Sequence, residues 1–182
     1  MTLRGMAGDV TTGFVAGYAG TKAMEPVRMF LYRHEPDEDR QKEDAVRPGP
    51  PYRIAATKIT RLLGLDRSEE SLDEAGLGLH YGLAVSCAPL SGILRHRARL
   101  GTPAAALATG VAMSVTADED FTPLLGFSAP SRACPLVTHL RGVAAHLVFG
   151  AAVAAREATW PAARWATNLA GPRRALGSEG LR

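Results

Sequence analysis

Residues 101–117, GTPAAALATGVAMSVTA, contain no charged side chain, and the acidic triplet Asp118-Glu119-Asp120 follows them directly. Three further windows have the same apolar character, at residues 7–24, 77–94 and 138–155. The chain contains 21 Lys and Arg residues and 18 Asp and Glu residues, but the only ones inside the four windows are Asp9, Lys22 and Arg141. Almost all of the charge is therefore confined to the segments between the windows.

The length of these windows is close to that of a membrane span, for which about 18 or more apolar residues are needed. They are rich in Ala and Gly instead of Leu, so each is only marginally hydrophobic on an insertion scale. The alternative is a water-soluble all-α globule, whose helices need a charged face opposite the apolar stripe. Residues 101–117 offer only Thr and Ser for such a face. We therefore predict an all-α protein, a four-span transmembrane helical bundle.

The length of 182 residues fits one domain. We predict a four-helix membrane domain over residues 1–158 and a basic interfacial C-terminal tail over residues 159–182. A hydrophilic loop, 33–75, separates the first two spans, and residues 34–51 are expected to be exposed loop because Pro and Gly punctuate their end. Within the loop, Tyr52–Leu65 has helical amphipathic spacing, which predicts a helix on the bilayer surface or over the end of the bundle.

Arginines indicate the orientation, because cytoplasmic loops carry an excess of Lys and Arg. The short loop after the second window contains Arg95, Arg97 and Arg99, and the C-terminal tail combines Trp160 with further arginines. Both termini are therefore predicted to be cytoplasmic. The eight Lys and Arg residues between Arg33 and Glu74 compete with this orientation.

The ionisable residues near the windows fall at one membrane level. In an up-and-down arrangement, the ends of spans one and three lie beside the beginnings of spans two and four. At or just below this level lie Glu25, His80, Asp118, Glu119, His139, Arg141 and His146. Ionisable groups are costly in a membrane, so they usually face the bundle interior and pair with one another. We predict a polar cluster, with His146 about 10 Å deeper than His139 on the same helix face.

Three uses of this cluster stay open from the sequence. In a structural use, Arg141 and the histidines neutralise the carboxylates and hold the helices together. In proton or ion handling, His146 continues a relay inward, since His titrates near neutrality. In a metal or haem site, His80 and His139 supply ligands together with carboxylates, although the sequence has no tight ligand motif such as HExxH.

Small residues spaced by four let helix backbones approach closely in lipid, where packing replaces the hydrophobic effect. The first window has this spacing twice, in Gly13 with Gly17 and in Ala16 with Gly20. Chance is the alternative explanation in a chain rich in Ala and Gly. We predict helix-packing positions at Gly13, Gly17, Gly20, Gly78, Gly82, Gly142 and Gly150.

Catalytic motifs are missing from the sequence, which has no GxSxG, no Walker A loop, no dinucleotide fingerprint and no paired CxxC. We therefore predict a protein that is not an enzyme and has no cofactor, with metal or haem as the alternative given above. The net charge of +3 reflects the loops, and no nucleic-acid binding is expected. The expected partners are the lipid bilayer and other membrane-protein subunits or a second copy of the chain.

Several short motifs are shared with a known family. They are GFVAGYAGTKAM at residues 13–24, His80-Tyr81-Gly82, Asp118-Glu119, and Arg141-Gly142 followed by His146-Leu147-Val148-Phe149-Gly150. In these motifs the chain resembles the YagU-like family, small bacterial inner-membrane proteins of uncharacterised function, one of them associated with acid tolerance. The resemblance covers about residues 8–155. It implies an integral protein of the bacterial inner (plasma) membrane and no mechanism.

From these observations we expect a non-enzymatic accessory or structural component of a larger membrane assembly. The first alternative is a proton- or ion-handling (acid-stress) membrane protein that uses the His and carboxylate cluster. The second is a metal- or haem-binding membrane protein.

Overall fold

The computed structural model describes residues 3–96 and 98–169, apart from the side chains of residues 3–13, 92, 96, 157 and 160–169. Every regular element in this part of the chain is helical, which confirms the all-α prediction. The elements are, in chain order, α1 (Leu3–His34), α2 (Asp37–Val46), α3 (Pro51–Leu62), α4 (Glu69–Cys87), α5 (Pro89–His96), α6 (Thr102–Met113), the π-helix η1 (Ser114–Phe121), α7 (Thr122–Leu124), the 3-10 turn η2 (Ser131–Ala133) and α8 (Leu136–Leu169).

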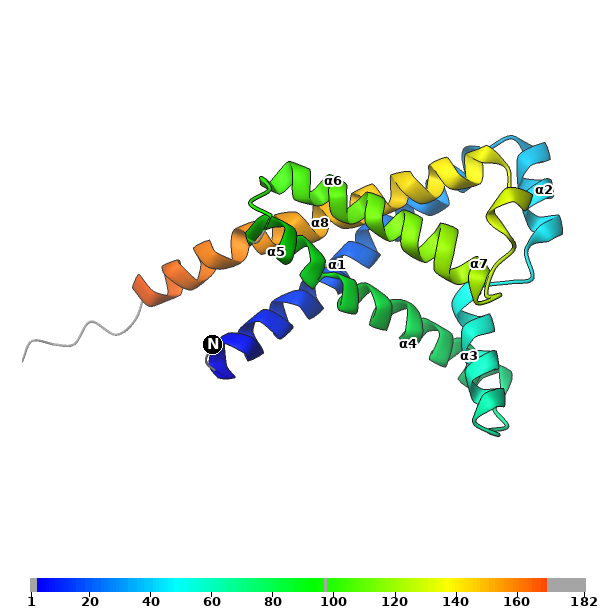
Figure 1. Ribbon diagram of the computed structural model, residues 1–182, viewed down its shortest axis with the longest axis horizontal. Coiled ribbons are helices and arrows are strands. Elements are labelled where there is room, and N and C mark those ends of the chain that lie inside the picture. The colour runs from blue at the N-terminus through cyan, green and yellow to red at the C-terminus, as the bar shows by residue number, and fades with distance from the viewer. Residues whose placement is uncertain (1–2, 97, 170–182) are drawn as a thin grey trace, which may run out of the picture.

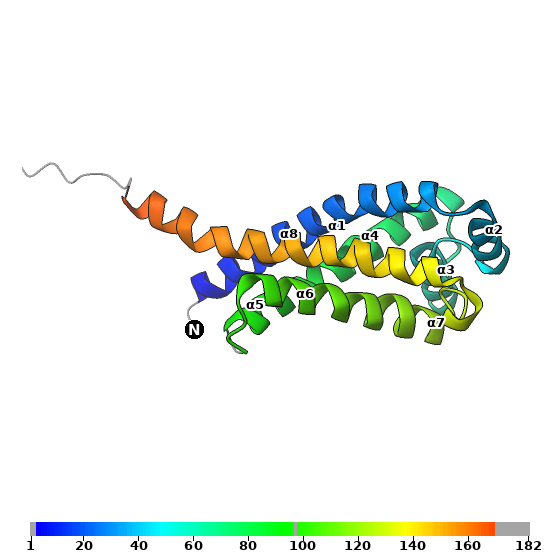
Figure 2. The ribbon, with the colours of Figure 1, turned by 90° about the horizontal axis from the view of Figure 1, so that it is seen from above.

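Four long segments run up and down beside one another: α1, α4 with α5, α6 with η1, and α8 (Figure 1). The start of α1 and the end of α8 lie at one end, whereas α2, α3 and α7 gather at the other (Figure 2). The most extensive contacts join α8 to α1 and to α6, while α4 packs on α1 and α3. The helix α8 is thus central, and it continues past residue 158 without a break into the first part of the predicted tail.

Local chemistry explains where the second long segment begins and bends. The N-cap of α4 is Ser68, whose side-chain oxygen accepts a hydrogen bond from the Ser71 backbone N–H, three residues into the helix. Pro89 separates α4 from α5, because its ring removes a backbone donor and clashes with the preceding turn. All four apolar windows therefore lie in helices, and the second is divided by a proline.

Two segments of the described chain are long and apolar enough to cross a membrane, Glu69–Arg95 and Leu136–Arg156. Only 18% of the first apolar stretch and 33% of the second is buried inside the protein. The core helix of a water-soluble protein would be mostly buried, so these segments turn much of their apolar surface outward. The windows 7–24 and 101–117 are helical but do not reach the same criterion, so the four-span arrangement stays a prediction.

The core along the bundle axis is built from small side chains around Phe149. Ala16, Ala84, Ala88, Met24, Met113, Ala145 and Val153 surround this ring, and all of them are buried. Alanines at these contacts let the helix axes approach closely. Packing therefore depends on positions where a larger side chain has no room.

Glycines mark the closest backbone contacts. A Cβ on Gly17 would lie 2.7 Å from Val85 Cα, a Cβ on Gly20 would lie 2.7 Å from the Phe149 ring, and a Cβ on Gly150 would overlap the Ala106 carbonyl oxygen. Gly142 has Asp118 Oδ2 at 3.1 Å from such a Cβ.

Two of the predicted glycine positions border open space among the residues that the structure describes. A Cβ on Gly78 or Gly82 would meet nothing within 4 Å, and the surroundings of Gly13 lie outside the described residues. A further close contact, not predicted from the sequence, is at Gly110, where a Cβ would lie 2.6 Å from the His146 carbonyl oxygen.

The expectation of an exposed loop at residues 34–51 is wrong. Asp37–Val46 forms α2, with three acidic residues in its first turn, and Glu43 on this helix is fully buried. Acidic residues at a helix N-terminus interact favourably with the macrodipole, which stabilises even so polar a helix. The amphipathic segment forms α3, which packs against α4 where a Cβ on Gly76 would lie 3.0 Å from Arg53 Cα.

The contrast between Gly110 and Gly78 predicts opposite effects of the same substitution. Gly110→Ala forces a Cβ against the α8 backbone and should lower the stability by about 1–3 kcal/mol. Gly78→Ala meets open space and should raise it by about 0.5–1 kcal/mol through helix propensity. Thermal unfolding of both variants in one mild detergent checks this, and equal midpoints would contradict the close contact of α6 with α8.

Candidate functional site

A network of buried ion pairs, which we call the Arg141 clamp, ties α2 to the first turns of α8. Its members are Glu35, Glu43, Arg47, Thr138 and Arg141. Arg141 is 4% exposed and Glu43 is 0% exposed. The Arg141 guanidinium donates from Nη1 to Glu35 Oε2 at 2.5 Å, and from Nη2 to Glu43 Oε1 and Oε2 at 2.6 and 2.7 Å.

Two further donors complete the Glu43 carboxylate. Arg47 Nη2 lies 2.8 Å from Oε1, and Thr138 Oγ1 donates to Oε2 at 2.7 Å. Burial alone would raise the pKa of Glu43. The hydrogen bonds from Arg141 and Thr138 and the charges of Arg47 and Arg141 outweigh this effect, so the pKa lies below its usual value. Glu43 therefore stays ionised in the interior, with both oxygens satisfied.

The remaining contacts of the clamp leave one atom without a partner. The Tyr32 ring lies 5.0 Å from Arg141 Cζ, so the guanidinium also has a cation–π contact. Glu35 Oε1 is buried and has no hydrogen-bond partner among the described residues. Two arginines and two glutamates balance one another, so the clamp is a neutral structural unit.

A second group of polar side chains, which we call the interior polar cluster, lies deeper between the helices. Its members come from α1, α3, α4, η1 and α8. They are, in chain order, Arg28, Tyr52, His80, Ser114, Asp118 and His146. Asp118 is the carboxylate that acts on the Arg28 guanidinium. His80 is acted on electrostatically by Glu25, Arg28, His146 and Asp118.

Asp118 and His146 form the ion pair at the centre of this cluster. Nδ1 of His146 lies 3.4 Å from Asp118 Oδ2 and 2.9 Å from the Gly142 carbonyl oxygen. Both neighbouring oxygens can accept a hydrogen bond from Nδ1. The Asp118 side chain is 41% exposed, whereas that of His146 is 8% exposed. The pair therefore joins the protein surface to the interior.

The other cluster members include two polar atoms without partners. His80 Nδ1 and Ser114 Oγ are buried and make no hydrogen bond to the described residues. The Tyr52 ring covers His80, with 4.6 Å between the ring centroids. Burial raises the pKa of the Tyr52 phenol to about 12, helped by the charge of Asp118. Tyr52 is therefore a neutral side chain that covers His80, and the unpartnered His80 Nδ1 and Ser114 Oγ can still form hydrogen bonds.

A separate pair closes the end of the bundle. His139 Nδ1 lies 2.6 Å from Glu119 Oε1, and its Nε2 lies 3.0 Å from the Ser131 carbonyl oxygen. Both ring nitrogens of His139 therefore have an oxygen neighbour within hydrogen-bond distance. This pair bridges η1, η2 and α8.

The π-helix sets where these carboxylates point. Ser114–Phe121 continues α6 with i→i+5 hydrogen bonding, which widens the turns. Successive residues Asp118 and Glu119 then reach two different histidines of α8, His146 and His139. Single π turns inside α-helices are frequent at functional sites.

The predicted seven-residue cluster is thus divided among the clamp, the interior polar cluster and the His139–Glu119 pair. Glu25 borders the interior polar cluster, because its charge acts on His80, while Tyr81 Oη donates to it at 3.3 Å and Lys22 pairs with it at 3.3 Å. Arg141 contacts neither Asp118 nor Glu119 by an ion pair in the described structure, because Glu35 and Glu43 occupy its guanidinium. His80 and His139 lie in different groups. No set of three or more His, Cys, Asp or Glu residues in the described chain is arranged to hold a metal.

Seven residues of these sites were missed from the sequence. Two of them, Ser114 and Thr138, are uncharged side chains inside the apolar windows. Glu35, Glu43 and Arg47 belong to a charge-rich stretch in which a buried carboxylate is hidden among exposed ones. Arg141 could have indicated such a carboxylate, because a single cation in an apolar window needs an acidic partner. Arg28 and Tyr52 lie outside the windows, and no pattern in the sequence placed them inside.

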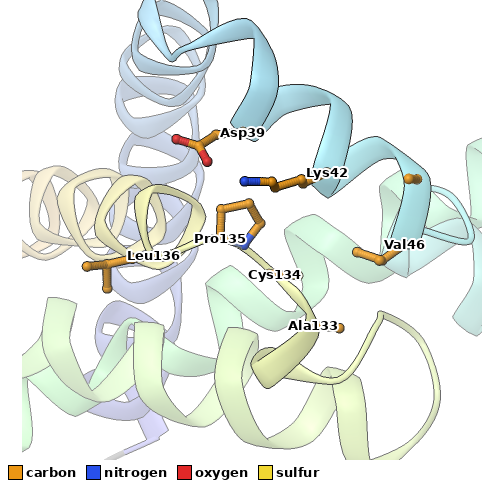
Figure 3. Close-up of a pocket in the computed structure, with 8 residues that line it drawn as sticks. Asp39, Lys42, Val46, Ala133, Cys134, Pro135 and Leu136 are labelled. Atoms are coloured by element: carbon orange, nitrogen blue, oxygen red, sulfur yellow. The ribbon is translucent and has the colours of Figure 1, made fainter.

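A shallow cavity of about 450 Å³ lies beside the clamp, between α2 and the chain that leads into α8 (Figure 3). Asp39 and Lys42 flank it on α2, and the Pro135 ring and Cys134 lie opposite. Lys42 Nζ forms an ion pair with Glu38 Oε1 at 2.8 Å. Burial raises the pKa of the Cys134 thiol. The cavity therefore offers neither a free cation nor a reactive thiolate.

The Arg141 clamp predicts a loss of stability in acid. The folded-state pKa of Glu43 is lower than its ordinary value of 4.5, so the stabilisation is complete above 4.5 and is lost as pH falls through the lowered value. Glu43→Gln should cost about 3 kcal/mol at neutral pH and flatten the acid side of the curve. Thermal unfolding between about pH 7 and about pH 3 measures this. Glu38→Gln, on the exposed face of α2, should change little, and equal curves for both variants would contradict the clamp.

Comparisons with family models, with curated proteins and with solved structures find no match to this chain. The resemblance to the YagU-like family therefore stays a prediction that rests on its short motifs. The geometry of the clamp and of the interior polar cluster is the basis for the function proposed next.

Proposed function

We propose that this protein is an integral membrane protein with four spans, and that it acts as a non-enzymatic accessory or structural component of a larger membrane assembly. The observation that carries the proposal is the outward-facing apolar surface of Glu69–Arg95 and Leu136–Arg156. Large side chains that water would disfavour are more than half exposed along the helices, among them Phe14, Leu77, Ile93, Leu107 and Leu140. Lipid or another apolar helix is the surrounding that fits them.

The packing supports four spans. Because α1 and α6 lie along α8, a bilayer crossed by α8 would also enclose them. The uncharged part of α6 and η1, from Thr102 to Ala117, extends about 24 Å at 1.5 Å per residue, which is about one helical turn short of the hydrocarbon thickness. Helix α1 is longer still, with 32 residues.

An accessory role accounts for the face of α4 on which Gly78 and Gly82 have no neighbouring helix within the described part of the chain. Gly78 and Gly82 are one helical turn apart and border open space, while Leu77 beside them is 57% exposed. Small residues at this spacing are typical of helix–helix contacts in lipid. The tightly paired Arg141 clamp supports a rigid scaffold.

We place the protein in the bacterial inner membrane with both termini in the cytoplasm. The end of the bundle that holds the start of α1 and the end of α8 also carries the arginine-rich connection between α5 and α6 (Figure 1). Short loops rich in Arg stay on the cytoplasmic side.

Membrane fractionation followed by photo-crosslinking tests this proposal. The full chain should stay in the pellet after an alkaline carbonate wash, because its spans are surrounded by lipid. A photoreactive side chain at Leu77 should give a discrete protein adduct in cells, whereas the same probe at Leu62, exposed at the end of α3, should not. Recovery in the supernatant would overturn the membrane assignment, and lipid adducts alone from Leu77 would overturn the accessory role.

A second candidate function, proton or ion handling, is favoured by the Asp118–His146 pair. Asp118 reaches the surface, His146 lies inside, and the unpartnered atoms of His80 and Ser114 lie in the same cluster. Together they form a short chain of groups that can accept and pass a proton.

Liposomes with a pH step across the membrane test the second candidate. His146→Ala and Asp118→Asn should both slow the decay of the step, because each interrupts the chain at one end. His34→Ala, which changes an exposed histidine at the end of α1, should leave the decay unchanged. Identical traces for wild type and all three variants would exclude the relay.

A further inference from the structure

The outer side of α1 carries an ion pair at the surface of an apolar window. Of the three charged residues inside the four windows, Arg141 is buried in the clamp, whereas Lys22 lies at the surface. Its Nζ lies 3.3 Å from Glu25 Oε2, and the two side chains are 52% and 42% exposed. Charged groups at membrane depth usually face protein instead of lipid. The exposed pair therefore indicates a surface that another protein covers.

Aromatic side chains extend this surface toward the start of α1. Tyr18 and Phe14 lie one and two turns before Lys22 on the same side of the helix, and they are 47% and 57% exposed. The Tyr18 ring stacks on Tyr81 of α4 with 5.3 Å between the centroids. Lys22 Nζ lies 5.4 Å from the centroid of the Tyr81 ring, and Tyr81 Oη donates to Glu25. Tyr81 thus joins α1 and α4 into one surface.

Beside these rings, α4 has a position without a side chain. Gly82 follows Tyr81 directly, it is exposed, and a Cβ on it would meet nothing within 4 Å. Because Tyr18 stacks on Tyr81, Tyr18 and Gly82 lie at the same level along the bundle. The α1–α4 face, as we call this surface, consists of Phe14, Tyr18, Lys22, Glu25, Tyr81 and Gly82.

Charge complementarity favours a second copy of this chain as the partner of the α1–α4 face. The face presents one cation and one anion three residues apart, so its partner has to present both signs at the same spacing. A twofold axis meets this requirement, because the same patch is then used by both copies. Both copies enter the membrane in the same orientation, so the axis runs along the membrane normal and equal levels meet. Lys22 and Glu25 differ in level by about 4.5 Å, a distance that their long side chains can span.

Shape complementarity leads to the same partner. With the axis along the membrane normal, Tyr18 of one copy comes to the level of Gly82 of the other. The protruding ring and the open glycine are therefore placed to fit each other twice in one dimer. Helices in lipid associate by such close packing on small residues.

We propose that two copies of this chain associate through the α1–α4 face. Tyr18 of each copy packs over Gly82 of the other, and Lys22 of each copy pairs with Glu25 of the other. The inference rests on the proposed membrane function, since lipid is the surrounding that makes an exposed ion pair costly. It gives the larger assembly at least two copies of this chain.

Charge reversal in full-length chains with two different tags tests the ion pairs. Lys22→Glu gives a face with two anions, and Glu25→Lys gives a face with two cations, so neither variant should associate with itself. Co-purification of the two tags in mild detergent should fall at least about tenfold for each variant alone, because like charges across an interface are strongly unfavourable. Lys22→Glu chains co-expressed with Glu25→Lys chains should co-purify at the wild-type level, because opposite charges then meet.

Gly82→Ile tests the packing without disturbing the single chain. Its side chain enters open space in one copy, so the thermal unfolding of the separated chain should not fall, but it blocks the approach of Tyr18 from the second copy. Ala104→Ile places the same side chain at an exposed position of α6, whose main contacts are α5, α8 and η1. Only Gly82→Ile should lower the co-purification of the two tags.

Each result decides about the dimer. Wild-type chains that do not co-purify, Gly82→Ile chains that co-purify like wild type, or charge variants that do not associate with each other overturn it. A different protein recovered in place of the second copy also overturns it and leaves the accessory role intact. Recovery of the wild type in the supernatant after the carbonate wash contradicts the proposed membrane function separately.

Discussion

The Arg141 guanidinium is buried and must be paired with carboxylates. This pairing determines how one end of the protein is arranged. The energetic penalty for an unpaired buried charge is several kcal/mol, and the carboxylates that pair with Arg141 come from outside α8. The chain meets the requirement with Glu35 and Glu43, which it brings in by folding the acidic stretch after α1 into α2. The location of α2 is therefore determined by the charge of Arg141 on α8, which is distant from α2 in the sequence.

Close contact between helices is the second constraint. Gly110, Gly150 and Gly17 face backbone atoms of a neighbouring helix at distances that exclude any side chain. Such contact brings η1 beside α8, so that Asp118 and Glu119 reach His146 and His139. The polar sites are thus located by small residues elsewhere in the bundle, and the same kind of residue is left open on the outer face of α4.

The helices themselves could be predicted from the sequence, because apolar windows without charge have few other stable forms. The pairing of Asp118 with His146 and of Glu119 with His139 was within reach of an argument from membrane level alone. The π turn was not, since nothing in SVTADEDF distinguishes it from ordinary helix. Nor was the burial of Glu43, because its neighbours on α2 carry the same charges and face water. Gly78 and Gly17 show a similar limit: their spacing is alike, but only the tertiary arrangement decides which of them touches a helix.

The separation of the clamp partners along the chain has a consequence for biosynthesis. Glu35 and Glu43 precede Arg141 by 106 and 98 residues, so the ribosome delivers the acidic half long before the basic one. Chains acquire structure from the N-terminus as they are made, and during that interval the two carboxylates lack their arginine partner and have to stay hydrated. The ion pairs form only after α8 has been synthesised. In a nascent chain that ends before α8, α2 would therefore not be fixed to the rest of the protein.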